Sequence, residues 1–187
     1  MSKQRMDRRD WLALGLQRLA DDGPRALKLE VLCVAASRTR GSFYHHFKDH
    51  SDFLGQLAKF WLGQNTETLI ANTQVGATPE RLRLLAALAG DVNAAVERGM
   101  RRLGAAYPRI QTVINKADHI RIAYLAELHM AADALDADSA QQFAKFEYAT
   151  YVGSQILWGR SYRTEWQAAS QLLESLLAGQ TRRNSRN

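Results

Sequence analysis

Residues 26–49 read ALKLEVLCVAASRTRGSFYHHFKD, and this stretch decides the expected fold. Its first part has apolar residues at the i, i+3, i+4 and i+7 spacing of one helix face, which predicts a short helix over 29–36. The apolar positions are Leu29, Leu32, Cys33 and Ala36. Ser37-Arg38 then forms a brief turn, and Thr39 can cap another short helix by accepting a bond from a backbone N–H. The sequence therefore predicts two short helices joined by a tight turn.

The second of these helices has two unlike faces. Phe43 and Phe47 are four residues apart, so both would point into a small core. The other side carries hydrogen-bond donors, namely Arg40, Ser42, Tyr44 and His45, with Arg38 just before the helix. Arginine binds guanine edges or phosphate, hydroxyl groups bind phosphate oxygens, and Gly41 would let the backbone approach DNA closely. A helix-turn-helix needs this division, because its second helix enters the major groove.

The charge of the chain is concentrated at the same end. The formal net charge is +6. Residues 1–50 hold ten basic and six acidic side chains, residues 51–180 hold twelve and thirteen, and the last seven residues hold three Arg. A basic end on a nearly neutral body indicates a polyanionic partner, although an ordinary solvated basic surface explains the charge equally well.

The rest of the chain predicts helices and no strands. Apolar residues from Trp11 to Ala20 follow helical spacing, and Gly23-Pro24 ends that helix. Further helices are expected over about 49–71, 79–89, 91–105, 108–134, 139–161 and 165–178. Thr78, Asp138 and Thr164 are the expected N-caps of three of them. No segment alternates like a strand, so we expect an all-α fold of about nine helices.

Several other classes of protein are disfavoured. The longest uncharged run with apolar residues near its middle, Tyr148 to Gly159, is too short to span a bilayer. Arg18 interrupts the N-terminal apolar stretch, which argues against a signal peptide and for the cytoplasm. Cys33 is alone, so neither an internal disulfide nor a Cys-rich zinc site is expected. His46 and His50 have the spacing of a metal pair but no obvious further ligand, so no metal or other cofactor is expected.

The stretch over 26–49 closely resembles the DNA-binding domain of tetracycline-repressor (TetR) family regulators. The run Gly41-Ser-Phe-Tyr-His-His-Phe47 is the most specific part, and the resemblance covers about residues 8–55. It implies a homodimeric repressor, less often an activator, that a small molecule releases from a palindromic operator. It also implies a DNA-binding domain over 1–50 and a ligand-binding and dimerisation domain over 51–180, followed by a disordered basic tail over 181–187.

The resemblance also assigns roles within the DNA-binding domain. Bases would be read by Arg40, Ser42 and His45. Phosphates would be held by Lys28, Thr39, Tyr44, Lys48 and His50, with Arg38 and Gly41 at the same surface. Four residues depart from the family pattern: Lys28 replaces a capping Thr or Ser, Ser37 a turn Gly, Arg38 an apolar residue, and His50 a Lys or Arg. Each change costs about 1 kcal/mol or less in a cap or turn, which is small beside the phosphate contacts.

The larger domain carries candidates for two further roles. A cavity for a small apolar or aromatic effector would be lined by Phe60, Trp61, Met100, Tyr124, His129, Phe146 and Thr150, although plain core packing explains each of them as well. The last two helices hold more apolar side chains than one small core buries, which indicates a four-helix dimer interface. Its expected residues are Tyr151, Trp158, Trp166, Leu173 and Leu177. The two-fold axis would set the reading helices about 34–36 Å apart.

Two other functions are compatible with an all-α fold. The same fold could act as a protein-interaction module without tight DNA binding, and salt-dependent binding to a duplex distinguishes the two. An all-α enzyme could use His129 with a carboxylate such as Asp133. The sequence has no Gly-rich phosphate loop and no nucleophile beside a base, so catalysis is not expected.

Overall fold

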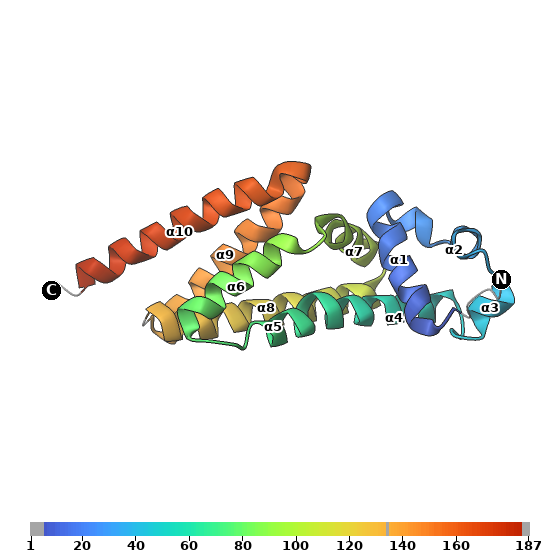
Figure 1. Cartoon of the computed structure of the whole chain (residues 1–187), viewed down its shortest axis with the longest axis horizontal. Helices are drawn as coiled ribbons and strands as arrows, with labels where there is room; N and C mark the ends of the chain where they lie inside the picture. Colours follow the sequence, from blue (N-terminus) through green and yellow to red (C-terminus); the bar gives the residue numbers. More distant parts are fainter. Residues whose placement is uncertain (1–5, 134, 185–187) are drawn as a thin grey trace. The chain divides into compact units, whose positions relative to one another are not determined.

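The computed structural model describes residues 6–133 and 135–184, with side chains described for all of these except 133, 160, 174 and 176–184. The regular structure of these residues is entirely helical, which confirms the all-α class (Figure 1). The helices are α1 (Arg8–Asp22), α2 (Leu29–Ala36), α3 (Arg40–Tyr44), α4 (His50–Leu62), α5 (Thr68–Asn72), α6 (Thr78–Asp91), α7 (Ala94–Ala106), α8 (Pro108–Asp133), α9 (Ala137–Leu157) and α10 (Tyr162–Asn184). A π-helical turn, Gly63–Glu67, joins α4 to α5, so the predicted helix over 49–71 is one helical run.

Helix starts show where the sequence prediction was right and where it was wrong. Thr39 caps α3 as predicted. Thr78, however, is the first residue of α6, and the preceding Ala77 N–H donates to Glu80 Oε2 at 2.6 Å. α9 is capped by Asp136, whose Oδ1 accepts from the Ser139 N–H at 2.9 Å, and not by Asp138. Both aspartates can cap a helix, and the apolar spacing does not decide between two such residues so close together.

The last helix also differs from its predicted bounds. α10 begins at Tyr162, so the proposed cap Thr164 lies inside its first turn. The helix continues to Asn184 and so includes the first four residues of the segment expected to be a disordered tail. Residues 185–187 of that segment lie outside the described residues.

The chain divides into two compact units. The first contains the described residues 6–66 and 93–117, and the second contains residues 67–92 and those from 118 onward. This grouping places α4 and α7 with α1 to α3, whereas the sequence predicts a boundary at residue 50. The reason is packing: α1 lies against α7 and α4 as well as α2 (Figure 1).

An aromatic cluster forms the core of the first unit. The ring of Phe43 lies 5.4 Å from Trp11, 5.0 Å from Phe47 and 5.3 Å from Phe53, measured between centroids. All four side chains are at most 1% exposed. Edge-to-face and tilted pairs at such distances add about 0.5–1.5 kcal/mol each beyond their buried area. The cluster joins α1, the helix-turn-helix and α4 into one core.

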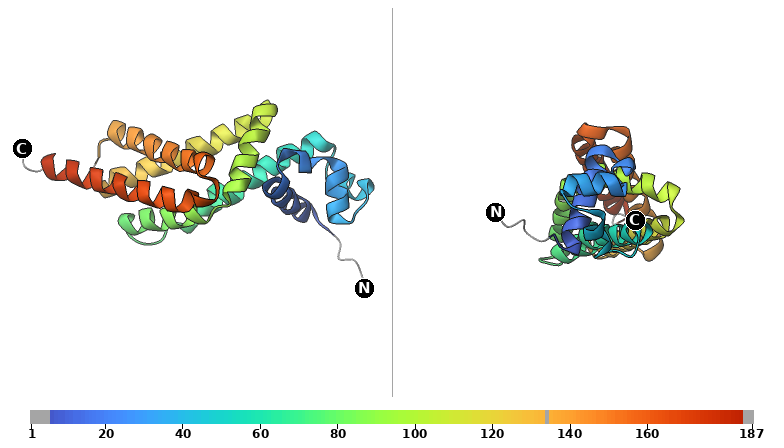
Figure 2. Two further views of the ribbon diagram at one scale, coloured as in Figure 1. Left: turned by 90° about the horizontal axis from the view of Figure 1, so that it is seen from above. Right: turned by 90° about the vertical axis from the view of Figure 1, so that its right-hand side faces the viewer.

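The second unit is built around α9 and α10, which pack against each other and run side by side in the left view of Figure 2. Its core holds Leu125, Ala126, Ala140, Ala144, Tyr148, Tyr151 and Trp166. Two tyrosine hydroxyls also bond carbonyls near the C-terminal end of α6: Tyr151 donates to Ala89 O at 2.9 Å, and Tyr162 to Gly90 O at 2.8 Å. Helix-end carbonyls lack intrahelical partners, so these bonds attach α6 to the last two helices.

Candidate nucleic-acid interface

α2, the turn after it and α3 form the predicted helix-turn-helix. α2 ends at Ser37, whose backbone is left-handed with φ 50° and ψ 45°. The turn is closed by two bonds, from the Ser37 N–H to Val34 O at 3.0 Å and from the Arg38 N–H to Cys33 O at 2.9 Å. A left-handed residue other than glycine costs about 1 kcal/mol, so the turn is formed but strained at Ser37.

α3 is stabilised by its N-cap and by two buried aromatic side chains, because it is too short to be stable alone. Thr39 Oγ1 accepts from the Ser42 N–H at 3.3 Å. A helix of five residues is too short to be stable alone, so the burial of Phe43 and Phe47 in the aromatic cluster must fix it. The opposite face of α3 is thereby left to solvent.

Arg40, the first residue of α3, is paired in the structure with a residue that the sequence analysis did not single out. Its Nη2 lies 2.7 Å from Glu30 Oε1 on α2, and the two side chains are 63% and 62% exposed. The partners are ten residues apart, and no helical spacing signals this pairing. An exposed ion pair contributes only about 0.2–1 kcal/mol, so Arg40 can exchange Glu30 for a DNA base at little cost.

The other predicted DNA contacts lie around the same surface. Exposed positions are Lys28, Thr39, Gly41, Tyr44, His45 and Lys48. Lys28 stands at the N-cap of α2 and makes no side-chain capping bond, as its replacement of Thr or Ser predicts. Ser42 and Arg38 are partly exposed, and Arg38 Nη1 donates weakly to Ser37 O at 3.3 Å. Cationic and hydroxyl groups therefore gather on the open side of the helix-turn-helix.

The two histidines next to the motif are bonded within the chain. His50 Nε2 donates to Leu27 O at 2.7 Å, and His46 Nε2 donates to Met6 O at 3.1 Å. The Nε2 atom of each ring is therefore used by the carbonyl of a different segment. In this geometry the Nε2–H of His50 is used by Leu27 O, and Nδ1 could donate to a phosphate only in the imidazolium form, in which both ring nitrogens carry a proton.

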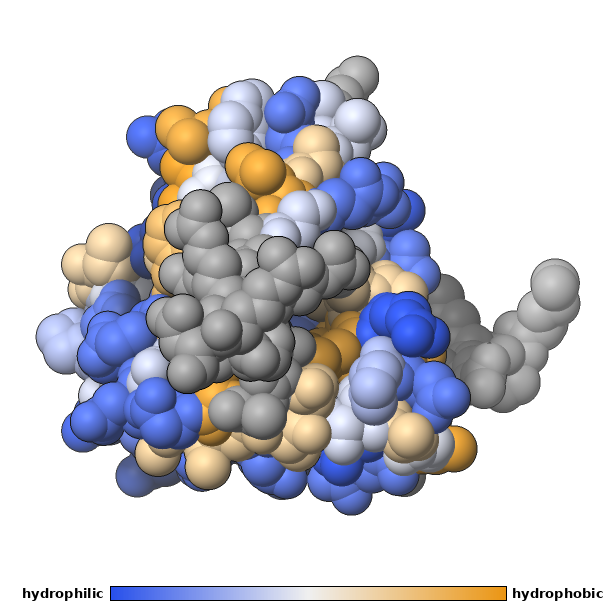
Figure 3. All heavy atoms as spheres, turned by 90° about the vertical axis from the view of Figure 1, so that its left-hand side faces the viewer, coloured by the Kyte–Doolittle hydropathy of each residue, from blue (hydrophilic) through white to orange (hydrophobic). Residues whose placement is uncertain are grey.

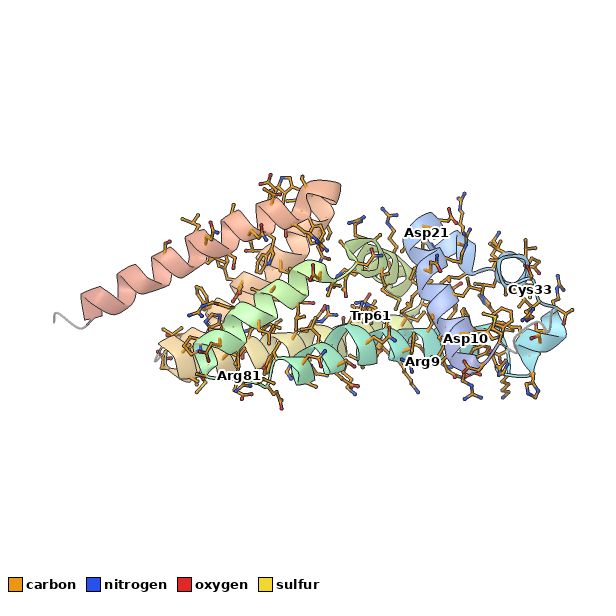
Figure 4. The ribbon with its side chains drawn as sticks, viewed as in Figure 1. Arg9, Asp10, Asp21, Cys33, Trp61 and Arg81 are labelled. Atoms are coloured by element: carbon orange, nitrogen blue, oxygen red, sulfur yellow. The ribbon has the colours of Figure 1, made fainter. Side chains whose placement is uncertain are left out.

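The predicted effector-lining residues fall in both units. Phe60, Trp61 and Met100 belong to the first, whereas Tyr124, His129, Phe146 and Thr150 belong to the second. Trp61 on α4 is fully buried and donates from Nε1 to Glu97 Oε1 on α7 at 3.1 Å (Figure 4). Phe146 is 58% exposed, and Thr150 donates to the Phe146 carbonyl at 2.9 Å.

Buried polar contacts in the second unit were also missed by the sequence analysis. His129 Nε2 lies 2.6 Å from Glu147 Oε2, and Phe143 packs edge-on to the imidazole with centroids 4.8 Å apart. The Tyr124 hydroxyl lies 2.7 Å from Thr73 Oγ1 and accepts from Arg81 Nη2 at 3.1 Å. His129 and Glu147 are 18 positions apart, on either side of a helix junction, so no local pattern could have joined them.

The predicted dimer residues need a correction. Tyr151, Trp166 and Leu173 are buried within the unit itself and so present almost no surface to a partner. Trp158 is 43% exposed, and the side chain of Leu177 lies outside the described residues. Among the side chains that the structure describes on α9, after it and on α10, the large apolar ones that are exposed are Phe146, Ile156, Leu157, Trp158 and Leu172. Figure 3 shows the face of the molecule that points left in Figure 1, and apolar and hydrophilic side chains are intermixed on it.

Among the described residues, no helix combines the length and the hydropathy that crossing a bilayer requires. No protein-family model matches the chain, and no curated protein matches it in sequence.

Solved structures do match it. A transcriptional regulator from Saccharomonospora viridis in complex with choline superposes with a TM-score of 0.76 at 16% identity, over 89% of this chain and 95% of that one. A TetR-family regulator from Rhodococcus sp. gives 0.71 at 17% identity, over 93% and 98%. The ketosteroid transcriptional regulator of Mycobacterium tuberculosis gives 0.61 at 18% identity, over 96% of each chain. At these identities the likeness establishes the fold, which is that of TetR-family transcriptional regulators.

Proposed function

We propose that this chain is a TetR-family transcriptional regulator that binds a palindromic operator as a homodimer and leaves it when a small molecule binds. The observation that carries the proposal is the open face of α3. A five-residue helix is anchored from below by Phe43 and presents Arg40, Tyr44 and His45 to solvent. Such a helix after a tight turn matches the reading element of a helix-turn-helix, and the similarity of fold supports the same role.

The contacts divide by chemistry. Arg40, Ser42 and His45 would read base edges, because they lie at the start and along the open side of α3. Lys28, Thr39, Tyr44 and Lys48 would hold phosphates, with Arg38 beside them and His50 through Nδ1–H when its ring carries both protons. Phosphate contacts supply most of the affinity and base contacts supply the sequence preference. This mode of action requires no cofactor, and it would place the protein in the cytoplasm with the DNA.

Dimerisation would use the exposed apolar residues on and after α9 and on α10. Phe146, Ile156, Leu157 and Leu172 are each more than half exposed, which is unusual for side chains of this size in one region. A second copy would bury them in a four-helix interface. The two-fold axis would then present two α3 helices to successive major grooves of a palindrome.

The effector is proposed to be a small apolar or aromatic molecule that binds within the domain predicted over residues 51–180. Aromatic and polar side chains occur together there, as in Tyr124 with Thr73 and His129 with Glu147. Sites for small molecules combine an apolar lining with a few such oriented polar groups. An effector that binds the DNA-free form better by about 1–3 kcal/mol is enough to release the operator.

The test is a binding assay with a matched control. Arg40→Ala and Arg163→Ala each remove an exposed arginine that is paired with a carboxylate, the second with Asp91 at 3.3 Å. Duplexes selected from a random pool are titrated with each protein by fluorescence anisotropy at several salt concentrations. Arg40→Ala should lose about 1–3 kcal/mol of operator affinity and the base preference, and Arg163→Ala should lose little. Absence of salt-dependent binding to any duplex would instead favour the protein-interaction module.

A further inference from the structure

We propose that a groove between α4 and the first turns of α8 is a binding site for organic anions that carry an apolar body. The groove lies within the first unit and has a volume of about 760 Å³. Small-molecule sites have volumes of about 300–1,000 Å³, so the groove is of the right size. It is lined by residues of α4 from its cap to Lys59 and by residues 107–113.

The groove has an apolar lining. Leu54 and Ile110 are 3% and 2% exposed, and Tyr107 and Val113 line it beside them. Gly55 also lines the groove, and a Cβ added there would meet no atom within 4 Å. Glycine within a helix is about 1 kcal/mol less favourable than alanine, and here its missing side chain keeps the groove open. An apolar body such as a ring can therefore rest on this side of α4.

The charged groups of the groove favour an anion, because its three cations, Lys48, Lys59 and Arg109, outnumber its two acids, Asp49 and Asp52. Its two acids are already engaged: Asp49 Oδ1 accepts from the Asp52 N–H at 2.8 Å, and Asp52 Oδ2 accepts from the Lys48 N–H at 3.0 Å. In the part of the chain that the structure describes, no side-chain hydrogen bond or ion pair involves Lys59 or Arg109. Lys59 and Arg109 beside an apolar wall therefore complement a sulfonate, carboxylate or phosphate attached to an apolar group.

A free small molecule fits these features better than the DNA backbone does. Phosphates bind exposed cations on a convex or flat surface and gain nothing from a recessed apolar wall. The inference therefore does not depend on the proposed function, and it is tested without DNA.

The probe is 1-anilinonaphthalene-8-sulfonate, with N-phenyl-1-naphthylamine as its uncharged counterpart. Both are titrated into the full-length protein by fluorescence. Replacing Lys59 and Arg109 together by Met should weaken binding of the sulfonate about tenfold, as expected when charge-assisted hydrogen bonds are lost, and leave the amine unchanged. The control replaces Arg83 and Lys145, exposed cations of the second unit, by Met and should change neither affinity more than about twofold.

Two further measurements locate the probe. Gly55→Leu should weaken binding of both compounds, because leucine would occupy the part of the groove beside α4, and circular dichroism checks that the variant folds. In the unmodified protein, the amide resonances of Gly55 and Val113 should shift on titration with the sulfonate, a result that does not depend on any variant. Unmoved resonances, or equal sulfonate affinity in the variant without Lys59 and Arg109, would overturn the proposal.

Discussion

Replacing Glu30 by Gln should tighten operator binding. In the structure Glu30 Oε1 holds Arg40 Nη2 at 2.7 Å, and both side chains are about two-thirds exposed to solvent. To bind a base, Arg40 must leave this carboxylate. Because an exposed ion pair contributes about 0.2–1 kcal/mol, removing it should raise operator affinity by about 1.4- to 5-fold.

Removing the negative charge of Glu30 also raises DNA affinity in general, and this effect can be separated from the release of Arg40. Glu30 also places a negative charge near the phosphates, so its neutralisation favours any duplex, and this part weakens as salt screens it. Asp21→Asn is the matched control, since Asp21 is an exposed acid at the C-terminal end of α1 (Figure 4). The general charge effect appears in both variants and on both operator and unrelated DNA.

The assay is fluorescence anisotropy with operator and unrelated duplexes at two salt concentrations. The expected result is a gain for Glu30→Gln on the operator that exceeds its gain on unrelated DNA and exceeds that of Asp21→Asn. In an Arg40→Ala background this extra gain should vanish, because the two residues act as a pair. Weaker operator binding by Glu30→Gln would refute the reasoning and show that Glu30 orients Arg40 for base reading.

Three further predictions concern stability. Ser37→Gly should stabilise the protein by about 1 kcal/mol and raise Tm by a few degrees, because glycine accepts the left-handed backbone; an unchanged melting curve would contradict this. Gly99→Ala should destabilise it by about 1–3 kcal/mol in urea, since the new Cβ would lie 2.6 Å from Leu19 Cγ, whereas Gly90→Ala, with open space around it, should be neutral or stabilising. A hydrogen bond from the Gln56 side chain, more than any other interaction, lowers the pKa of Asp52 below its ordinary 3.8. The stability from Asp52 is therefore present above that value and lost as pH falls through the lower folded pKa, and Asp52→Asn should flatten this acid limb of unfolding free energy against pH.

The helix-turn-helix could be predicted residue by residue because its signals are local. The apolar spacing over 29–36, the cap at Thr39 and the inward position of Phe43 all appear in the structure where the sequence placed them. The N-cap prediction was wrong where two suitable residues lie close together, as with Asp136 and Asp138 at the start of α9. There the choice depends on how the chain enters the helix, which local composition does not encode.

The dimer and effector residues were less predictable for a different reason. Apolar periodicity marks a helix face as buried but does not say against what it is buried. Tyr151 and Trp166 proved to pack on each other within the unit, with centroids 5.2 Å apart, while Ile156 and Leu157 are exposed. Only the arrangement of α9 against α10 distinguishes an internal contact from a surface offered to a partner.

The sequence by itself determined the all-α class, the two short helices with their turn, and the donor-bearing side of α3, because each depends on contacts within about ten residues. The tertiary structure decided that Glu30 holds Arg40, that His50 is bonded to Leu27, and that Lys59 and Arg109 line one groove without a partner in the described residues. These relations join residues whose separation along the chain carries no periodic signal. They form only when packed helices bring their faces together.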